Sequence, residues 1–244
     1  MQKIIIVPDI GKVIITKKTN ASRVKLRVHP EKGVLITIPY YAKFKEGEDF
    51  LYKNLKWLHE MLNKLSEKKN DSLFKPGTVF VTNNLKLQFI THNKSAIAAK
   101  LEFGFINIYY NPEYSNFEDE RVQKFIKRFI LLCLKNEGQK YLPNRLDALS
   151  KKSGLKYRSV KIGTAGTRLG SCNSRNDIML SARLMLLPEN LIDYIILHEL
   201  CHIVHKNHGD KFHSLLNQLT DGHSDELNKR LKKSRIEITP GVYC

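Results

Sequence analysis

The sequence predicts an α+β fold, with a strand-rich N-terminal half followed by a mainly helical C-terminal half. Segments rich in β-branched residues and bounded by turn residues occur at 12–16, 23–28, 33–39, 79–81, 85–90 and 105–110. Apolar residues repeat at helical spacing at 50–65, 117–134 and 191–202. A short strand pair is expected before the last helices. Grouped strands and grouped helices of this kind are typical of α+β proteins.

The individual elements follow from local patterns taken in chain order. Over 23–28, basic residues alternate with valine and leucine, so this strand should be half-buried. The helix that includes Phe50 should end near Lys69, before a run of turn-forming residues. Asn83-Asn84 predicts a tight hairpin between two strands. The later helical pattern is expected to break around 138–143, which contains Gly138 and Pro143.

Pro112 and its polar neighbours separate the strand-rich half from the helical half. We therefore expect two regions, a strand-rich N-terminal region with one long helix at 1–112 and a helical region at 113–244. The sequence contains no internal repeat and no low-complexity segment.

Composition limits the kinds of protein that this chain can be. Its 244 residues are enough to bury a core without disulfides, and its four cysteines are scattered without CxxC pairing, which favours a reducing compartment. The N-terminal apolar run is too short for a secretory signal, and no stretch is apolar enough to span a bilayer. These features predict a cytoplasmic protein without a membrane partner.

Net charge is strongly positive, at +17 from 41 Lys and Arg against 24 Asp and Glu. Such an excess attracts polyanions, so non-specific binding of nucleic acid through a basic surface is one interpretation. The alternative is a well-solvated lysine-rich surface, because the basic clusters are short and dispersed.

The segment around His198 carries the chemistry. An apolar run without internal Gly or Pro leads into His198-Glu199-Leu-Cys-His202, with Pro188 before the run and Gly209 after it. Positions four apart share a helix face, so His198 and His202 can bind one ion. Glu199 is adjacent and can act as a general base on the water that a metal activates.

A catalytic zinc ion needs a third protein ligand and one open position. His208 is the best candidate, because it precedes Gly209 and can sit where the chain turns back towards the pair. His205 competes, although its helical direction is rotated away from the pair. His213 and His223 are more remote candidates.

A chance HExxH match on an ordinary helix is the competing interpretation. The helical context argues against it, and six of the nine histidines fall between residues 198 and 223. We therefore predict a Zn²⁺ site and hydrolysis of a carbonyl or phosphoryl centre, with Glu199 moving the proton. The residues alone do not distinguish an amide from another electrophile.

Several motifs in order then resemble one family. Arg168-Leu-Gly170-Ser171-Cys172 is followed by the HExxH segment and by Asn207-His208-Gly209, and this resembles the YgjP-like metallopeptidases, which are related to SprT-like zinc proteases. The resemblance implies a zincin-like catalytic region at 113–244, with a short strand pair beside the HExxH helix.

Carried over residue by residue, the resemblance implies that His198, His202 and His208 bind zinc and that Glu199 is catalytic. It also implies that 168–172 form a strand and turn beside the metal helix. Leu169 departs from the family, where tryptophan is usual. The implied substrate is a protein or peptide.

Other functions stay open at this point. The resemblance also allows a nucleotide (UTP) pyrophosphatase and a DNA-associated SprT-like protease, and the zinc could instead stabilise a binding domain. Arg168, Tyr157 or Tyr194 could assist an oxyanion. Cys201 should be a core residue, and Cys172 is more readily structural than catalytic. The sequence does not predict the oligomeric state.

Overall fold

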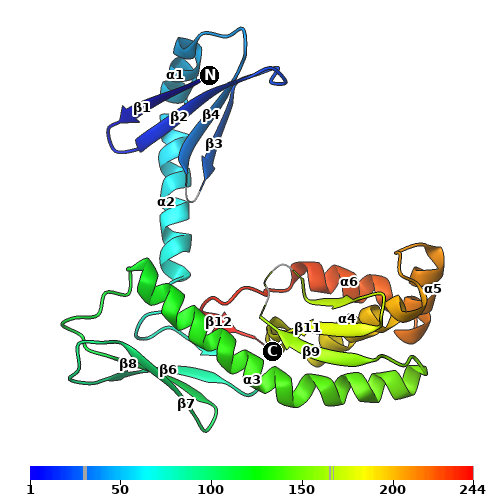
Figure 1. The fold of residues 1–244 in the computed structure, drawn as a ribbon. Coiled ribbons are helices and arrows are strands. Elements are labelled where there is room, and N and C mark those ends of the chain that lie inside the picture. Colours follow the sequence, from blue (N-terminus) through cyan, green and yellow to red (C-terminus); the bar gives the residue numbers. More distant parts are fainter. Residues whose placement is uncertain (30–31, 165, 167, 244) are drawn as a thin grey trace. The chain divides into compact units, whose positions relative to one another are not determined.

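A computed structural model describes residues 1–29, 32–164, 166 and 168–243, and the side chains of residues 68 and 69 are not described. Within this part of the chain, strands dominate the first part of the sequence and helices the second, which confirms the predicted α+β class. The chain divides into two compact units, Met1–Ser72 and Leu73–Cys244 (Figure 1). Each unit is described by itself.

The first unit is a four-stranded sheet with two helices. Its elements are β1 (Gln2–Val7), β2 (Gly11–Lys18), β3 (Lys25–His29), β4 (Gly33–Pro39), α1 (Phe44–Lys53) and α2 (Leu55–Asp71). The strand order is β1-β2-β4-β3, and β2 and β4 run parallel. Ile15, Ile36 and Ile38 are almost completely buried on the helix side of the sheet. A Cβ on Gly47 of α1 would lie 3.1 Å from Ile15 and from Ile38, so α1 packs closely on the strands there.

The expected single helix from Phe50 to about Lys69 is two helices in the structure. Asn54 separates them, with backbone angles of φ −112° and ψ 18°, and its side-chain amide donates to the carbonyl of Phe50 at 2.7 Å. An asparagine side chain that bonds to the backbone in this way satisfies a carbonyl left free where α1 ends. Strand β1 was not predicted as a separate element, and α1 begins six residues before the expected helix.

The second unit begins with a five-stranded sheet, in the order β12-β5-β6-β8-β7. Its strands are β5 (Phe80–Val81), β6 (Lys86–Thr91), β7 (Ala98–Glu102), β8 (Phe105–Tyr110) and β12 (Gly241–Val242). Strands β5 and β6 are antiparallel and flank the Asn83-Asn84 turn, as predicted. Phe80, Ile106 and Ile108 from this sheet form a core with Ile126 and Ile130 of the next helix. The division after Ser72 therefore differs from the expected boundary at 112/113, because these strands share a core with the helical part.

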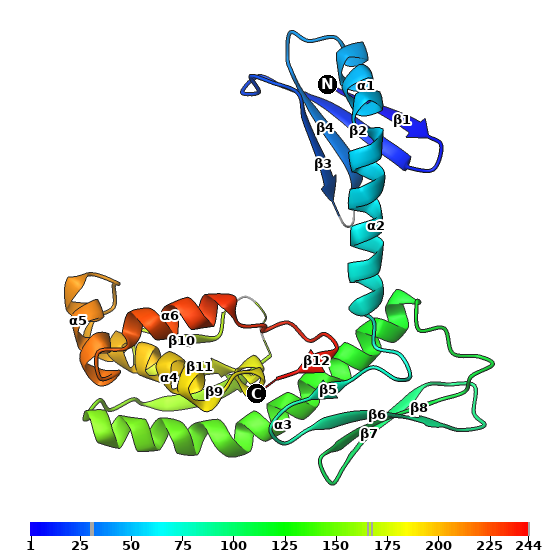
Figure 2. The ribbon, with the colours of Figure 1, turned by 180° about the vertical axis from the view of Figure 1, so that it is seen from behind.

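That next helix, α3 (Glu120–Ser153), runs along unit 2 in both views (Figures 1 and 2). The expected break at 138–143 is wrong, since the helix continues through Pro143. A proline there costs one backbone hydrogen bond. Burial offsets that cost, because Leu142 and Leu146 are fully buried. Gly138 lets Ile162 and Met185 approach, with a Cβ on it 3.4 and 3.6 Å from their side chains.

A three-stranded sheet, a 3₁₀ helix and three α-helices complete unit 2. They are β9 (Ser159–Gly163), β10 (Gly170–Cys172), β11 (Asp177–Ser181), the 3₁₀ helix η1 (Ala182–Leu186), α4 (Glu189–Val204), α5 (Asp210–Leu219) and α6 (Ser224–Lys233). The sheet order is β10-β11-β9, with β10 antiparallel and β9 parallel to β11. The predicted strand pair beside the HExxH helix is thus extended by β9.

Candidate metal centre

Helix α4 presents the candidate metal residues from inside the core of unit 2. The helix begins after Pro188 and ends at His205, whose φ of −119° and ψ of 102° are extended. Leu191, Ile196 and Leu200 are at most 1% exposed, so burial holds the helix in place. His198 and His202 are half-buried on the side of the helix opposite Ile196 and Leu200.

Three imidazoles converge where the sequence analysis expected them. One ring nitrogen from each of His198, His202 and His208 lies within 4.8 Å of the others, and of the described residues these form the group that could hold a metal. The Nε2 atoms of His198 and His208 are 3.0 Å apart. Two nitrogens bound to one tetrahedral zinc ion would lie about 3.3 Å apart, given Zn–N distances near 2.0–2.1 Å. The donor set therefore fits such an ion.

The protonation of His202 is fixed by a backbone carbonyl. Its Nδ1 lies 3.0 Å from the carbonyl oxygen of His205. Because a carbonyl only accepts, Nδ1 must carry the proton, and Nε2 of the neutral ring keeps its lone pair for a metal. His205 thus contributes through its backbone, and its ring is outside the convergent group.

Phe212 of α5 supports all three rings. It is 1% exposed, and its ring centroid lies 4.9, 4.7 and 4.7 Å from those of His198, His202 and His208. Such contacts restrict ring orientation beyond simple burial. This role of Phe212 was not predicted from the sequence. An apolar aromatic one turn into the helix after His208 was the available signal.

Glu199 is buried beside Gly170 of β10. The side chain is 6% exposed, and its Oε2 has no hydrogen-bond partner among the described residues. A Cβ on Gly170 would lie 2.6 Å from Oε1, 2.7 Å from Cγ and 2.9 Å from Cδ of Glu199. Only glycine fits there, so β10 and Glu199 are matched in shape.

Burial also sets the charge state of the centre. Burial raises the pKa of Glu199 to about 7, while the charge of Arg168 acts in the opposite direction. Burial, followed by the nearby imidazoles, lowers the pKa of His198 to about 4. The pKa of His202 is also lowered, mainly by burial. These two imidazoles are therefore neutral at pH 7, which is the form that binds metal.

Strand β10 is an edge strand of its sheet. The N–H of Ser181 donates to the carbonyl of Leu169 at 2.9 Å, and the N–H of Asn173 donates to Asp177 at 3.1 Å. Hydrogen bonding alternates along an antiparallel strand. The N–H and C=O groups of Gly170 and Cys172 therefore point away from β11, towards the edge.

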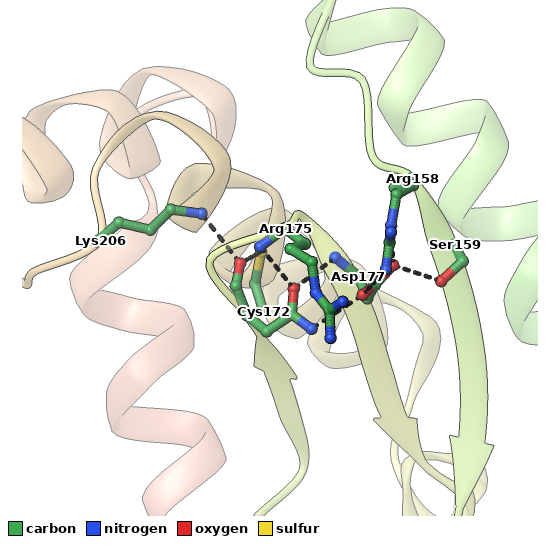
Figure 3. A network of polar contacts seen from close by, with 7 residues as sticks. Arg158, Ser159, Cys172, Arg175, Asp177 and Lys206 are labelled. Carbon is green, nitrogen blue, oxygen red and sulfur yellow. Dashed lines mark hydrogen bonds and ion pairs between the residues drawn. The ribbon is translucent and has the colours of Figure 1, made fainter.

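A polar network fixes the turn between β10 and β11 (Figure 3). Asp177 accepts hydrogen bonds from Arg158, Ser159 and Asn173, and the bond from Ser159 is 2.7 Å long. Together these bonds hold the pKa of Asp177 well below its usual range. Figure 3 shows Lys206 reaching this turn from the loop after α4.

Lys206 joins that network to the loop between α4 and α5, which carries His205 and His208. Its Nζ donates to the carbonyl of Asn173 at 3.1 Å and to Oδ1 of Asn176 at 2.8 Å. Lys206 lies between His202 and His208 in sequence, so its contacts tie the loop to the β10–β11 turn. Lys206 was not predicted from the sequence, because both of its partners are distant from it in the chain.

The remaining sequence candidates lie outside the convergent group. His213 is exposed on α5 with its ring 6.4 Å from that of His208, and His223 pairs with Glu226 at 3.6 Å. The hydroxyl of Tyr157 donates to Asp147, whereas the ring of Tyr194 lies 6.4 Å from that of His198.

The two cysteines near the site differ in burial. Cys201 is fully buried, as predicted, and burial raises its pKa to about 12. Cys172 is half-buried beside the centre, and burial raises its pKa too. Neither thiol is therefore an activated nucleophile.

Two imidazoles one turn apart beside a buried carboxylate, with a third from the next loop, define the class of metallopeptidases. Residues 22–234 match the family model described as YgjP-like, metallopeptidase domain, and the chain belongs to this family. The predicted resemblance is thereby confirmed.

Two solved structures resemble part of the chain. The crystal structure of the metallopeptidase zymogen of Methanocaldococcus jannaschii jannalysin is 23% identical and covers 37% of this chain and 93% of its own, with a TM-score of 0.34. The corresponding values for the Pyrococcus abyssi abylysin zymogen are 20%, 37%, 91% and 0.34. No curated protein matches the chain.

None of the described helices combines the length and the apolar character that crossing a membrane requires.

Proposed function

We propose that this protein is a zinc-dependent peptidase in which His198, His202 and His208 hold the ion and Glu199 is the general base. The observation that carries the proposal is the convergence of three imidazoles beside a buried, unpaired carboxylate. Neutral imidazoles suit zinc better than the hard cations that prefer oxygen ligands. When bound, zinc would lower the pKa of a water molecule and polarise a substrate carbonyl.

Glu199 is suited to move the proton. With a pKa of about 7, its carboxyl group can take a proton at neutral pH and release it again. Its unpaired Oε2 is the atom available for this transfer, since no protein group competes for it among the described residues. Gly170 holds the carboxyl group in place from the other side.

The edge strand supports a peptide as substrate. An extended peptide can add to a sheet edge through backbone hydrogen bonds. The outward N–H and C=O groups of Gly170 and Cys172 offer such bonds, and Gly170 lies against Glu199. A scissile bond in a peptide that pairs with β10 would therefore be close to the general base.

The test is peptide hydrolysis by zinc-loaded Glu199→Gln protein. The change removes the base but leaves the three imidazoles, so we expect zinc to stay near one per chain while kcat falls by at least about a hundredfold. Glu189→Gln, on the exposed first turn of the same helix, is the matched control and should keep full activity. Undiminished proteolysis by the Glu199→Gln protein would refute the proposed role.

The alternatives have separate outcomes in the same preparation. A UTP pyrophosphatase would release pyrophosphate in a manner that depends on His198, and a DNA-associated protease would be stimulated by DNA with a strong salt dependence. A structural zinc site would retain zinc without cleaving any peptide and would show a fourth protein ligand. The cytoplasmic location stays a prediction from the sequence.

A further inference from the structure

The sheet of the first unit has one face that its own helices do not cover. Val13, Ile15 and Ile36 point to the helix side and are at most 1% exposed. Because side chains alternate along a strand, their neighbours point the other way. We call this side the outer face. It includes Ile4 and Ile6 of β1, Lys12 and Lys18 of β2, and Lys25 and Arg27 of β3.

Charge on the outer face has one sign. Lys12, Lys18, Lys25 and Arg27 are exposed there, and strands β1 to β4 contain no Asp or Glu. Lys3, which points to the helix side, pairs instead with Glu48 of α1 at 2.6 Å. The carboxylates of α1 therefore compensate the covered side, while the outer face keeps its positive potential.

Strand register arranges the outer face in rows. Gln2, Thr16, Thr37 and Lys25 lie side by side across the sheet, and so do Ile4, Ile14, Leu35 and Arg27. Lys25 and Arg27 are two residues apart on edge strand β3, about 6.8 Å at 3.4 Å per residue. The first row offers hydroxyl, amide and ammonium donors, which are the groups that contact phosphates.

Two exposed tyrosines follow the outer face at the end of β4. Tyr40 and Tyr41 are 55% and 82% exposed, and they come directly after Pro39, which pairs with Lys18. Flat aromatic rings beside a basic surface allow bases to stack without sequence preference.

Exposed apolar surface on the same face raises the question of what covers it. Ile4 and Ile6 are 56% and 84% exposed. Face-to-face pairing with a second copy would bring like charges together, which is unfavourable. A polyanion with flat apolar bases matches both the charge and the apolar row.

We propose that the outer face of the N-terminal sheet binds single-stranded nucleic acid, with Lys12, Lys18, Lys25 and Arg27 contacting phosphates and the two tyrosines stacking on bases. This surface lies in the first unit, whereas the candidate metal centre lies in the second. The proposal does not depend on the proposed peptidase activity.

The test is fluorescence anisotropy of a labelled oligo-dT strand titrated with the full chain at several salt concentrations. Four phosphate contacts on a single strand predict a slope of log K against log salt near −2.8, or about a 50-fold loss of affinity between about 50 and 200 mM salt. Lys25→Ala with Arg27→Ala should reduce the slope to about −1.4. Lys45→Ala with Lys53→Ala, on exposed positions of α1, removes the same charge elsewhere and should leave the slope unchanged.

Further measurements separate phosphate contacts from stacking. Tyr40→Ser with Tyr41→Ser should lower the affinity for oligo-dT by about fivefold or more per base, with an unchanged salt slope. Duplex DNA should bind more weakly, because its stacked bases cannot reach the tyrosines. Thermal unfolding of each variant establishes that the chain is folded.

Four results would overturn the proposal. The first is a wild-type salt slope in the Lys25→Ala, Arg27→Ala variant, and the second is an equal reduction of the slope in the α1 control. The third is tighter binding of duplex DNA or polyglutamate than of oligo-dT. The fourth is a dimer in sedimentation that Ile6→Glu dissociates. Peptide hydrolysis is not measured in any of these experiments, so failure here is distinct from failure of the proposed peptidase.

Discussion

Replacing Gly170 with alanine should displace Glu199, the proposed general base, without disturbing the three proposed zinc ligands. The new Cβ would lie 2.6 Å from Oε1 of Glu199, while ordinary contacts begin at 3.4 Å. The carboxyl group must therefore move by about 0.8 Å, or β10 must move away from it. A misplacement of about 1 Å in a catalytic geometry can cost about a hundredfold in rate. We expect kcat on a peptide to fall by about that factor, with zinc near one per chain.

A matched control and a double variant make this prediction specific. Gly163→Ala introduces a Cβ 3.1 Å from the sulfur of Met179, whose flexible side chain can yield, so activity should be preserved. Gly170→Ala added to Glu199→Gln should have almost no further effect, because the displaced group is already absent. An unchanged kcat in the single variant, or additive losses in the double variant, would refute the shape argument.

Three further predictions concern the surroundings of the centre. Lys206→Met should loosen the loop between His202 and His208 and raise the zinc Kd by about tenfold in chelator competition. Lys211→Met, which changes an exposed lysine on α5, should leave the zinc Kd unchanged. Equal effects of the two changes would contradict the role of Lys206. Phe212→Ala should lower the free energy of unfolding of the zinc-free protein by about 3–5 kcal/mol in urea, since the ring is 1% exposed, and a loss below about 1 kcal/mol would contradict its supporting role. For pH dependence, the pKa of Glu199 rises from 4.5 to about 7 on folding, so the folded state binds more protons between these values and is stabilised as the pH falls through that window. His198, with its pKa lowered from 6.5 to about 4, acts in the opposite direction. From pH 8 to pH 5, the free energy of unfolding in urea of the zinc-free protein should therefore rise relative to that of zinc-free Glu199→Gln by up to about 3 kcal/mol. Parallel pH profiles of the two proteins would show that the pKa of the Glu199 carboxyl group is not perturbed.

The convergence of the histidines could be predicted because it is local. His198 and His202 share a helix face by spacing alone, and His208 follows after a loop short enough to return to them. The resemblance to the family also predicted that Gly170 and its neighbours lie beside the helix that carries His198 and His202. It did not reveal why glycine is needed there, because the contact between Gly170 and Glu199 joins residues from different elements.

What could not be predicted depends on contacts distant in sequence. Pro143 carries a local signal for a helix break, but the burial of Leu142 overrides it. The bonds of Lys206 to Asn173 and Asn176 exist only because α4 and the β10–β11 turn fold side by side. Nothing in the spacing of these residues indicates that they meet.

The carbonyl of His205 that orients His202 has a consequence for how this site would tolerate mutation. Because the contact belongs to the backbone, an alanine scan would score position 205 as silent, although it orients an imidazole. The dependence would emerge only from a change that alters the main chain. Proline would do so, because it cannot adopt the observed φ of −119° and removes the N–H that donates to Cys201 at 2.9 Å. The orientation of His202 in the candidate metal centre thus depends on the main-chain conformation at position 205 and not on the identity of the side chain there.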